Sequence, residues 1–234
     1  MILGSLSGAC DVWLISLLQV NQDLTELESV LSSQERERAA AFLLSAPRRQ
    51  FVVARAALRI LLGRYLGVSP SACNFALNAN GKPLLQPPSL LRFNLSHAGN
   101  LILIAISDSI DVGVDVEAHR KTNDLNSLAA SILCPADMEL WLALDAADRA
   151  TEFYRIWTCK EAITKAIGCG LAMDFRSIRI SIAPGRKPAL VSLDPPWDWT
   201  ERWTLQELET ESGYSAAIAA FIPDLNVTSH ALRL

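Results

Sequence analysis

Three short apolar runs in the middle of the chain decide the predicted sheet: RFNLS (Arg92–Ser96), LILIAI (Leu101–Ile106) and VGVDVE (Val112–Glu117). The first alternates apolar and polar side chains, which is typical of a half-buried strand. The second is apolar throughout, which favours a central strand buried on both faces. Because SDSID (Ser107–Asp111) between the second and third runs has turn chemistry, we expect those two runs to form a hairpin.

Helical and strand-like patterns extend outward from these runs on both sides. A capping box at Ser32 and Glu35 indicates one helix start, and glycines at 67, 168 and 170 indicate helix ends. The patterns predict strands at Val12–Leu18 and Phe75–Leu77, helices at Ser33–Leu44, Arg48–Leu66 and Thr151–Ile167, helical residues at 124–145, and strand-like pieces after Phe175. The order of strand, helices and strands occurs twice, with a join near 108–111, so we expect an α+β fold.

Composition excludes several classes of protein. The 234 residues fit one large domain or two small ones, and 50% hydrophobic with 20% charged residues is globular rather than disordered. A net charge of −4 disfavours broad binding to nucleic acid or anionic membranes. No apolar run is long enough to span a bilayer, and no basic residue precedes the mildly apolar N-terminus, so neither a membrane segment nor a signal peptide is expected. The five dispersed cysteines, without a CxxC pair, indicate reduced thiols in a cytoplasmic protein.

Two acidic residues share one face of the third run. Asp115 and Glu117 are two positions apart on a strand, with the valines of that strand on the opposite face. Two neighbouring carboxylates repel each other, and a cation would remove this penalty. Ligands that are all oxygen indicate Mg²⁺ or Mn²⁺ rather than zinc. The alternative is a plain strand with one solvated face.

The helix at Thr151–Ile167 places a lysine in an unusual position. Lys160 falls within the arc formed by the apolar residues of this helix, so it must either snorkel or meet an anion. Trp157, Glu161 and Lys165 follow at steps of four along the edge of the same arc. An ordinary i,i+4 ion pair would explain Glu161 and Lys165 but not Lys160.

The first run ends in Ser96-His97, which could offer two donors to a phosphate, although a lone histidine can equally be structural. The long first helix carries several basic residues: Arg48, Arg49, Arg55 and Arg59. Their alternative role is a solvated face, an interpretation favoured for Arg55 and Arg59 because they are four positions apart. No Walker loop or GxGxxG motif is present, so side chains and a metal would have to hold any phosphate.

Together these motifs resemble the 4′-phosphopantetheinyl transferases. GVDVE (Gly113–Glu117) precedes WTCKEAITKAIGCGL (Trp157–Leu171) by about the family's spacing, with FNLSHA and NGKP upstream. The likeness spans about Arg48–Leu171, and the length resembles the two-domain, Sfp-type branch. This resemblance implies two pseudo-symmetric ferredoxin-like halves, residues 1–109 and 110–234, with the active site in the cleft between them.

The resemblance also implies a reaction. The 4′-phosphopantetheine arm of coenzyme A would pass to a serine hydroxyl on an apo acyl or peptidyl carrier protein, releasing adenosine 3′,5′-bisphosphate. The first half would contact the nucleotide, and the second would hold the metal and the carrier protein. A cytoplasmic monomer with no nucleic-acid or membrane partner is expected.

Site residues follow from the motif positions. The implied ligands of Mg²⁺, with Mn²⁺ as a substitute, are Asp115, Glu117 and Glu161. The residues implied to bind coenzyme A are Arg49 and Lys82 near the 3′-phosphate, Ser96 and His97, Lys165 at the phosphates, and Lys160 there or in support of the site. The implied catalytic residues are Asp115, Glu161 and Lys165, with Trp157 as structural support.

Some roles stay open. Many Sfp-type members have a Phe-Ser-x-x-Glu stretch whose acid has been proposed as the base, whereas this chain has Leu133–Asp137, so a base role for Asp137 is in doubt. Glu161 or a metal-bound water could instead take the serine proton. Arg120-Lys121 and the following helix could meet an acidic carrier protein. The rival functions are a non-catalytic module that binds coenzyme A or carrier protein, and another Mg²⁺-dependent phosphoryl transferase.

Overall fold

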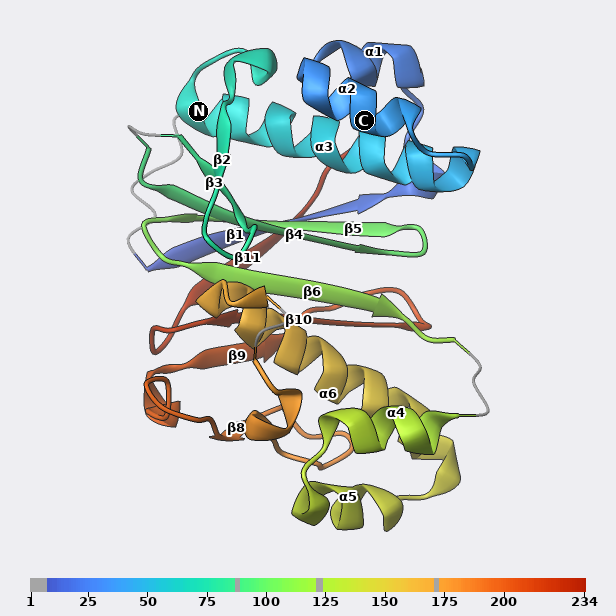
Figure 1. Cartoon of the computed structure of the whole chain (residues 1–234), viewed down its shortest axis with the longest axis vertical. Coiled ribbons are helices and arrows are strands. Elements are labelled where there is room, and N and C mark those ends of the chain that lie inside the picture. The colour runs from blue at the N-terminus through green and yellow to red at the C-terminus, as the bar shows by residue number, and fades with distance from the viewer. Residues whose placement is uncertain (1–7, 87–88, 121–123, 171–172) are drawn as a thin grey trace.

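The computed structural model describes residues 8–86, 89–120, 124–170 and 173–234, and it confirms an α+β architecture built on two main sheets (Figure 1). One sheet has the strand order β11-β1-β5-β4, and the other has the order β6-β10-β9. Their strands are β1 (Ala9–Ser16), β4 (Leu91–Ala98), β5 (Leu101–Asp108), β6 (Val112–Ala118), β9 (Thr204–Glu207), β10 (Tyr214–Ala220) and β11 (Asn226–Ala231).

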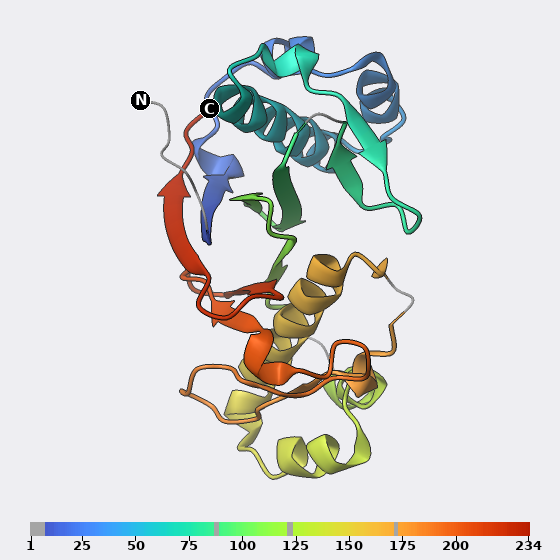
Figure 2. The ribbon, with the colours of Figure 1, turned by 90° about the vertical axis from the view of Figure 1, so that its left-hand side faces the viewer.

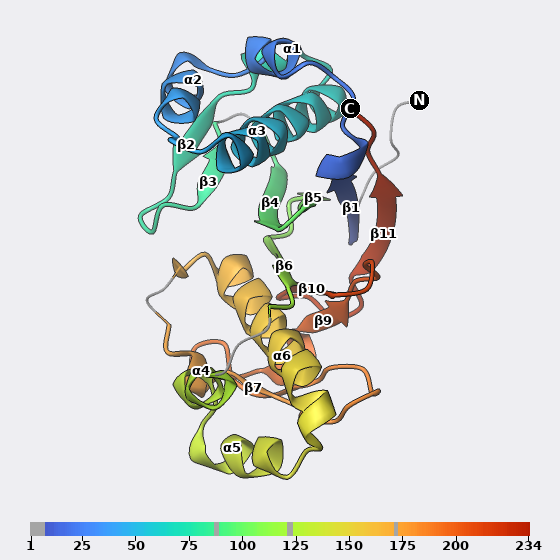
Figure 3. The same ribbon diagram turned by 90° about the vertical axis from the view of Figure 1, so that its right-hand side faces the viewer.

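Helices cover each sheet. Helix α3 (Ser45–Leu66) packs on the first sheet, and helix α6 (Ala146–Ile167) packs on the second (Figure 3). The smaller elements are α1 (Leu24–Ser29), α2 (Ser33–Ala40), α4 (Leu125–Ile132), α5 (Pro135–Leu142), β2 (Phe75–Leu77), β3 (Pro83–Leu85), β7 (Arg179–Ile180), β8 (Leu190–Ser192) and the 3-10 turns η1 (Leu17–Gln19), η2 (Pro70–Ala72), η4 (Phe175–Ser177) and η5 (Thr200–Arg202). The predicted capping box begins α2, which ends four residues before the predicted Leu44.

Strand β5 is central, as its apolar sequence predicts, but the expected hairpin with β6 is wrong. β5 pairs antiparallel with β1 on one side and with β4 on the other, so no edge is left for β6. β6 pairs instead with β10, contributed by the C-terminal part of the chain. Both faces of β5 are buried, since Ile102, Ile104 and Ile106 belong to the core under α3 and the alternate residues belong to another core.

The two sheets repeat one topology. The segments β1-α3-β4-β5 and β6-α6-β9-β10 give the equivalent orders β1-β5-β4 and β6-β10-β9. Helices α3 and α6 each have 22 residues and end at a left-handed glycine, Gly67 or Gly168. The structure therefore repeats one unit in its two halves.

One strand departs from the expected division at residue 110. β11 returns from the second half and pairs parallel with β1 in the first sheet (Figure 2). A shared core also lies between the sheets; its members include Leu101, Leu103, Ala105, Val112, Val114, Val116, Ala216 and Ile218. The halves are thus joined by buried apolar surface as well as by the chain. None of the described helices combines the length and the apolar character needed to cross a membrane.

Candidate active site

Gly113 explains how the acids of β6 meet helix α6. A Cβ atom at this glycine would lie 2.0 Å from the carbonyl oxygen of Ala162 and 2.3 Å from the backbone nitrogen of Ala166. The helix therefore lies directly on the strand, and only glycine permits this approach. Because Asp115 and Glu117 share the strand face of Gly113, they point toward the helix that carries Glu161 and Lys165.

Asp115 lies at the centre of a polar cluster between the halves. Its side chain is nearly inaccessible, and its Oδ1 accepts hydrogen bonds from Ser96 Oγ at 2.8 Å and Lys165 Nζ at 2.6 Å. Lys165 Nζ also donates to Ser96 Oγ at 3.0 Å. The structure thus brings together three of the predicted site residues, one each from β4, β6 and α6.

The second oxygen of this carboxylate has no partner. Asp115 Oδ2 is buried and makes no hydrogen bond. A buried carboxylate oxygen without a donor is costly, and such an atom in a native protein needs an explanation. A bound cation is one explanation that oxygen chemistry allows.

The three acids affect one another electrostatically. Burial raises the pKa of Asp115, and it outweighs the opposing effect of Lys165. Burial and then the charge of Asp115 raise the pKa of Glu117. Burial, followed by the charge of Asp115, likewise raises the pKa of Glu161, to which Glu117 also contributes. Mutual repulsion of this kind is what a divalent cation would relieve.

The acids are close but are not arranged as a finished metal site. Among the residues that the structure describes, no three histidine, cysteine, aspartate or glutamate side chains are grouped tightly enough to hold one ion. The unpaired Asp115 Oδ2 nevertheless fits the predicted ligand set, because it is a free carboxylate oxygen and the charge of Asp115 acts on both Glu117 and Glu161.

Lys160 lies apart from this cluster. It is completely buried, and its Nζ donates to the carbonyl oxygens of Ile132 at 2.5 Å and Phe175 at 2.8 Å. Burial lowers its pKa to about 8. The lysine therefore meets neutral carbonyls rather than an anion, and it connects α6 to the end of α4 and to η4. Trp157 packs against Phe175.

Lys82 connects the two halves at the end of α6. Its Nζ donates to the carbonyl oxygen of Lys165 at 2.7 Å, and burial lowers its pKa. The same β2–β3 turn supplies Asn78 and Asn80, whose amides donate to the Gly168 carbonyl at 3.3 and 2.9 Å. A cation at a helix C-terminus is electrostatically favourable. Lys82 therefore caps α6 rather than joining the Asp115 cluster.

The remaining predicted residues also lie outside the Asp115 cluster. The Nη2 atom of Arg49 donates to the carbonyl oxygens of Leu17 and Val20 at 3.2 and 3.1 Å. His97 is exposed beside the buried Ser96, as strand alternation requires. Asp137 is buried in an ion pair with Arg179, at 2.6 Å between Oδ1 and Nη2.

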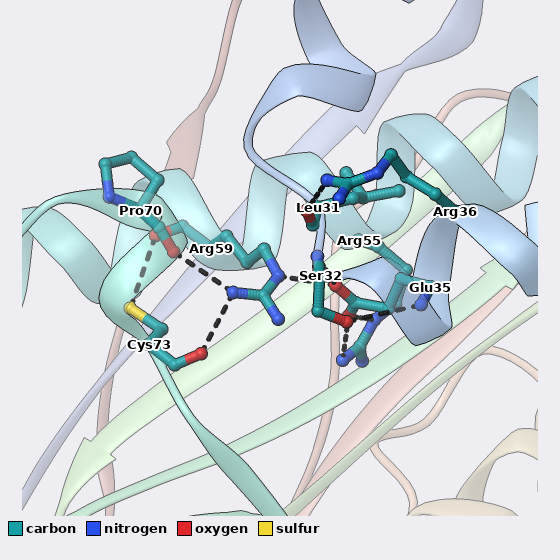
Figure 4. A network of polar contacts seen from close by, with 8 residues as sticks. All are labelled: Leu31, Ser32, Glu35, Arg36, Arg55, Arg59, Pro70 and Cys73. Atoms are coloured by element: carbon teal, nitrogen blue, oxygen red, sulfur yellow. Dashed lines mark hydrogen bonds and ion pairs between the residues drawn. The ribbon is translucent and has the colours of Figure 1, made fainter.

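Arg55 and Arg59 do not form the solvated face that their spacing favours. Figure 4 shows both guanidinium groups directed at Glu35 of the neighbouring helix. Arg59 is 3% exposed and also donates to the carbonyl oxygens of Pro70 and Cys73. The prediction fails because the acid comes from α2, outside the helix whose spacing was considered. The network borders a cavity of about 410 Å³ that is also lined by Arg38, Phe51 and Phe75.

A second cavity opens beside Glu117. It has a volume of about 340 Å³, and its other lining residues are Ala118, Arg120, Leu128, Phe153, Tyr154 and Trp157. Arg120 is fixed there because its backbone nitrogen donates to Tyr154 Oη at 3.0 Å. Lys121 and Leu171, which belong to the predicted carrier surface and to the second motif, lie outside the described residues.

One residue near the site was missed. Asn94 shares a strand face with Ser96, and its Oδ1 accepts a hydrogen bond from the backbone nitrogen of Val114 at 2.9 Å. The alternation of FNLSH places Asn94 and Ser96 together, so the available signal was a second polar side chain on the face of the serine.

Comparison with known proteins agrees with the geometry. Residues 111–219 match the 4′-phosphopantetheinyl transferase superfamily, and residues 19–109 match the family described as 4′-phosphopantetheinyl transferase, N-terminal. A relative from Nostoc, the 4′-phosphopantetheinyl transferase HetI, is 39% identical over 92% of this chain and 88% of its own length. The chain belongs to the 4′-phosphopantetheinyl transferase superfamily. It is therefore a transferase of the 4′-phosphopantetheinyl group, in a family that acts on carrier proteins with coenzyme A.

More distant similarities cover less of the molecule or have lower identity. The 4′-phosphopantetheinyl transferase Sfp of Bacillus subtilis is 25% identical over 84% of each chain. A crystal structure of the holo-[acyl-carrier-protein] synthase of Thermotoga maritima covers 49% of this chain and 64% of its own, at 21% identity and a TM-score of 0.40. The likeness to Sfp extends over both halves, in keeping with the two-domain branch that the sequence predicts.

Proposed function

We propose that this phosphopantetheinyl transferase moves the arm of coenzyme A to a serine hydroxyl of an apo acyl or peptidyl carrier protein, and that the reaction depends on Mg²⁺. The observation that carries the proposal is the unpaired Oδ2 of buried Asp115, beside two further acids and a lysine. These groups would otherwise keep an uncompensated negative charge in a buried place.

In this proposal the acidic residues bind the metal and Lys165 binds the phosphates. Asp115, Glu117 and Glu161 hold the Mg²⁺ ion, with Mn²⁺ as a substitute. The metal would neutralise charge on the pyrophosphate oxygens of coenzyme A. Lys165, whose Nζ donates to Asp115 Oδ1, would also donate to the phosphates, where charge develops during transfer. Asp115, Glu161 and Lys165 are the proposed catalytic residues.

The nucleotide end is proposed to bind the first half, with Ser96, His97, Arg49 and Lys82 as contacts. None of these four residues lines the cavity of about 410 Å³, and two of the guanidinium groups in that cavity already pair with Glu35. The placement therefore rests on the motif positions and not on the cavity. The domain assignment of residues 1–109 to the nucleotide and 110–234 to the metal and the carrier is part of this proposal.

The carrier protein is proposed to approach over the cavity beside Glu117. Arg120 supplies a positive charge at its rim, and Leu128 of α4 supplies apolar surface. An acidic helix of a carrier would match both features. We further propose that the enzyme acts as a cytoplasmic monomer, without nucleic acid or membrane.

The test incubates the protein with coenzyme A, Mg²⁺ and each of several apo carrier proteins, followed by intact-mass analysis. We expect a mass gain of one phosphopantetheine group on at least one carrier, and none on a carrier whose acceptor serine is replaced by alanine. Omission of Mg²⁺ with EDTA present should prevent the gain. A protein that binds coenzyme A but labels no carrier would instead be the non-catalytic module.

A further inference from the structure

The edge of β6 that faces the first sheet makes hydrogen bonds of an unusual kind. One edge of this strand pairs with β10, and the other faces β4 of the first sheet. Main-chain groups along that second edge bond to side chains instead of to another strand. The pairs are Val112 O with Lys82 Nζ at 3.4 Å, Val114 N with Asn94 Oδ1 at 2.9 Å, Val114 O with Lys165 Nζ at 3.3 Å, and Val116 N with Ser96 Oγ at 3.4 Å.

The four side chains that bond to this edge of β6 differ in whether they are also proposed to bind coenzyme A. Lys82, Ser96 and Lys165 are the residues proposed to bind coenzyme A or its phosphates. A phosphate that accepts from Lys165 Nζ would compete with Val114 O, because the three ammonium protons already go to Ser96, Val114 and Asp115. Ser96 Oγ only accepts from the backbone nitrogen of Val116, at 3.4 Å, which is a long contact. Asn94 has no such second role, is 8% exposed, and makes the shortest of the four bonds.

We infer that Asn94 is a positioning residue that holds β6, and with it the Asp115 carboxylate, while a phosphate occupies Lys165; this inference rests on the proposed function. Its carbonyl oxygen binds the backbone nitrogen of Val114, the residue directly before Asp115. Because the strand edge has no ladder partner there, loss of this acceptor frees the backbone next to the metal ligand. The expected consequence is a weaker metal site rather than a general loss of structure.

Two variants of Asn94 distinguish the effect of losing its hydrogen-bond acceptor from the effect of changing its shape. Asn94→Leu keeps the branching of the side chain and removes the acceptor, whereas Asn94→Asp keeps an oxygen that can accept from Val114. Thr204→Val is the matched control. Thr204 is also buried, its Oγ1 accepts from the backbone nitrogen of Leu225 at 3.0 Å, and it lies on β9, beyond β10 from the site.

Two measurements need no turnover. Amide hydrogen exchange is followed at Val114 in the free protein, and Mn²⁺ binding is measured with coenzyme A present. We expect Asn94→Leu to exchange Val114 at least about tenfold faster and to bind Mn²⁺ about 10–100-fold more weakly, the range seen when a supporting partner of a metal ligand is removed. Asn94→Asp should restore protection of Val114, and Thr204→Val should leave both measurements at wild-type values.

Turnover then completes the test. We expect Asn94→Leu to raise the Mg²⁺ concentration needed for half-maximal rate, with a smaller change in KM for coenzyme A. Unchanged Val114 exchange in Asn94→Leu overturns the inference, and so does an equal loss of Mn²⁺ binding in Thr204→Val. If the wild type labels no carrier protein, the proposed function fails, but the exchange of Val114 still reports on Asn94.

Discussion

Helices α3 and α6 occupy equivalent places in the two halves, but the buried charged groups near them differ in how completely they are hydrogen-bonded. On α3 itself, Arg59 is almost fully buried, and Glu35 and two carbonyl oxygens accept hydrogen bonds from it. Beneath α6, Asp115 has one oxygen bonded and the other without a partner. The repeated unit therefore contains a fully hydrogen-bonded ion pair in the first half, Glu35 with Arg59, which we call the completed side. In the second half the ion pair of Asp115 with Lys165 leaves one carboxylate oxygen unbonded, and we call this the incomplete side.

The pKa shifts express this difference. Burial alone would raise the pKa of Glu35, but the Ser32 backbone nitrogen together with Arg55 and Arg59 outweighs it, so the pKa falls below its usual value. At the second site the pKa of Asp115 is raised, because burial is compensated only in part. A carboxylate whose pKa is lowered by folding stabilises the folded state in its ionised form. A carboxylate whose pKa is raised is destabilised when it is ionised, and a bound cation would remove that cost.

The largest expected effect is on the incomplete side. Asp115→Asn should reduce carrier labelling on the order of 10²–10³-fold, the range for loss of one strong electrostatic contact in an active site. The free energy of unfolding should hardly fall, since the raised pKa shows that the fold disfavours the charge being removed. Labelling rate and chemical denaturation, measured on the same preparation, check both statements. Labelling that persists near the wild-type rate would remove Asp115 from the site.

The next effect separates two lysines of one helix. Lys165→Met should lose about 10²-fold in labelling, because it removes the cation beside Asp115 and the proposed phosphate contact. Lys160→Met should keep most of its labelling per folded molecule. It should instead lose about 2 kcal/mol of unfolding free energy, because the buried carbonyl oxygens of Ile132 and Phe175 lose their donor.

The expected difference between the two lysine variants disappears if Lys160 contacts the phosphates. In that event Lys160→Met would lose labelling as strongly as Lys165→Met while its stability stayed near that of the wild type. Lysine acylation gives an independent measurement. Lys165, with 27% of its side chain exposed, should react in the folded protein, and the completely buried Lys160 should react only after unfolding.

Local patterns predicted the part of the site that local geometry controls. Strand alternation and helical steps of four placed Ser96, Asp115 and Lys165 on known faces of their own elements. The resemblance to the 4′-phosphopantetheinyl transferases then implied that these three faces form one site. The α+β class followed from the order of elements in the same way. The two long helices were predicted to end at Gly67 and Gly168, because glycine at those positions ends a helix.

Non-local partners could not be predicted from spacing. The apolar run of β5 correctly indicated a central strand, but nothing in it names β1 and β4 as neighbours instead of β6. Glu35 reaches Arg55 and Arg59 from another helix, and Lys160 finds carbonyl oxygens at the ends of two other elements. β11 likewise returns to the first sheet from the far end of the chain. Such contacts depend on tertiary packing that sequence periodicity does not encode.

The smallest of these effects tests the completed side. Glu35→Gln should cost about 2 kcal/mol of unfolding free energy at pH 7, since it replaces the ionised acceptor of the buried Arg59 by a neutral one. The folded-state pKa of Glu35 is lowered from 4.5, so its stabilisation is fully present above that pH and is lost as the pH falls through and below it. The difference in unfolding free energy between wild type and variant should therefore narrow in denaturation curves as the pH falls below 4.5. Glu28→Gln removes the acid of the more exposed pair with Arg48 and should change stability by less than about 1 kcal/mol at any pH. A gap for Glu35→Gln that stays constant with pH would show that the arginines do not stabilise an ionised Glu35, and the contrast with Asp115 would then be lost.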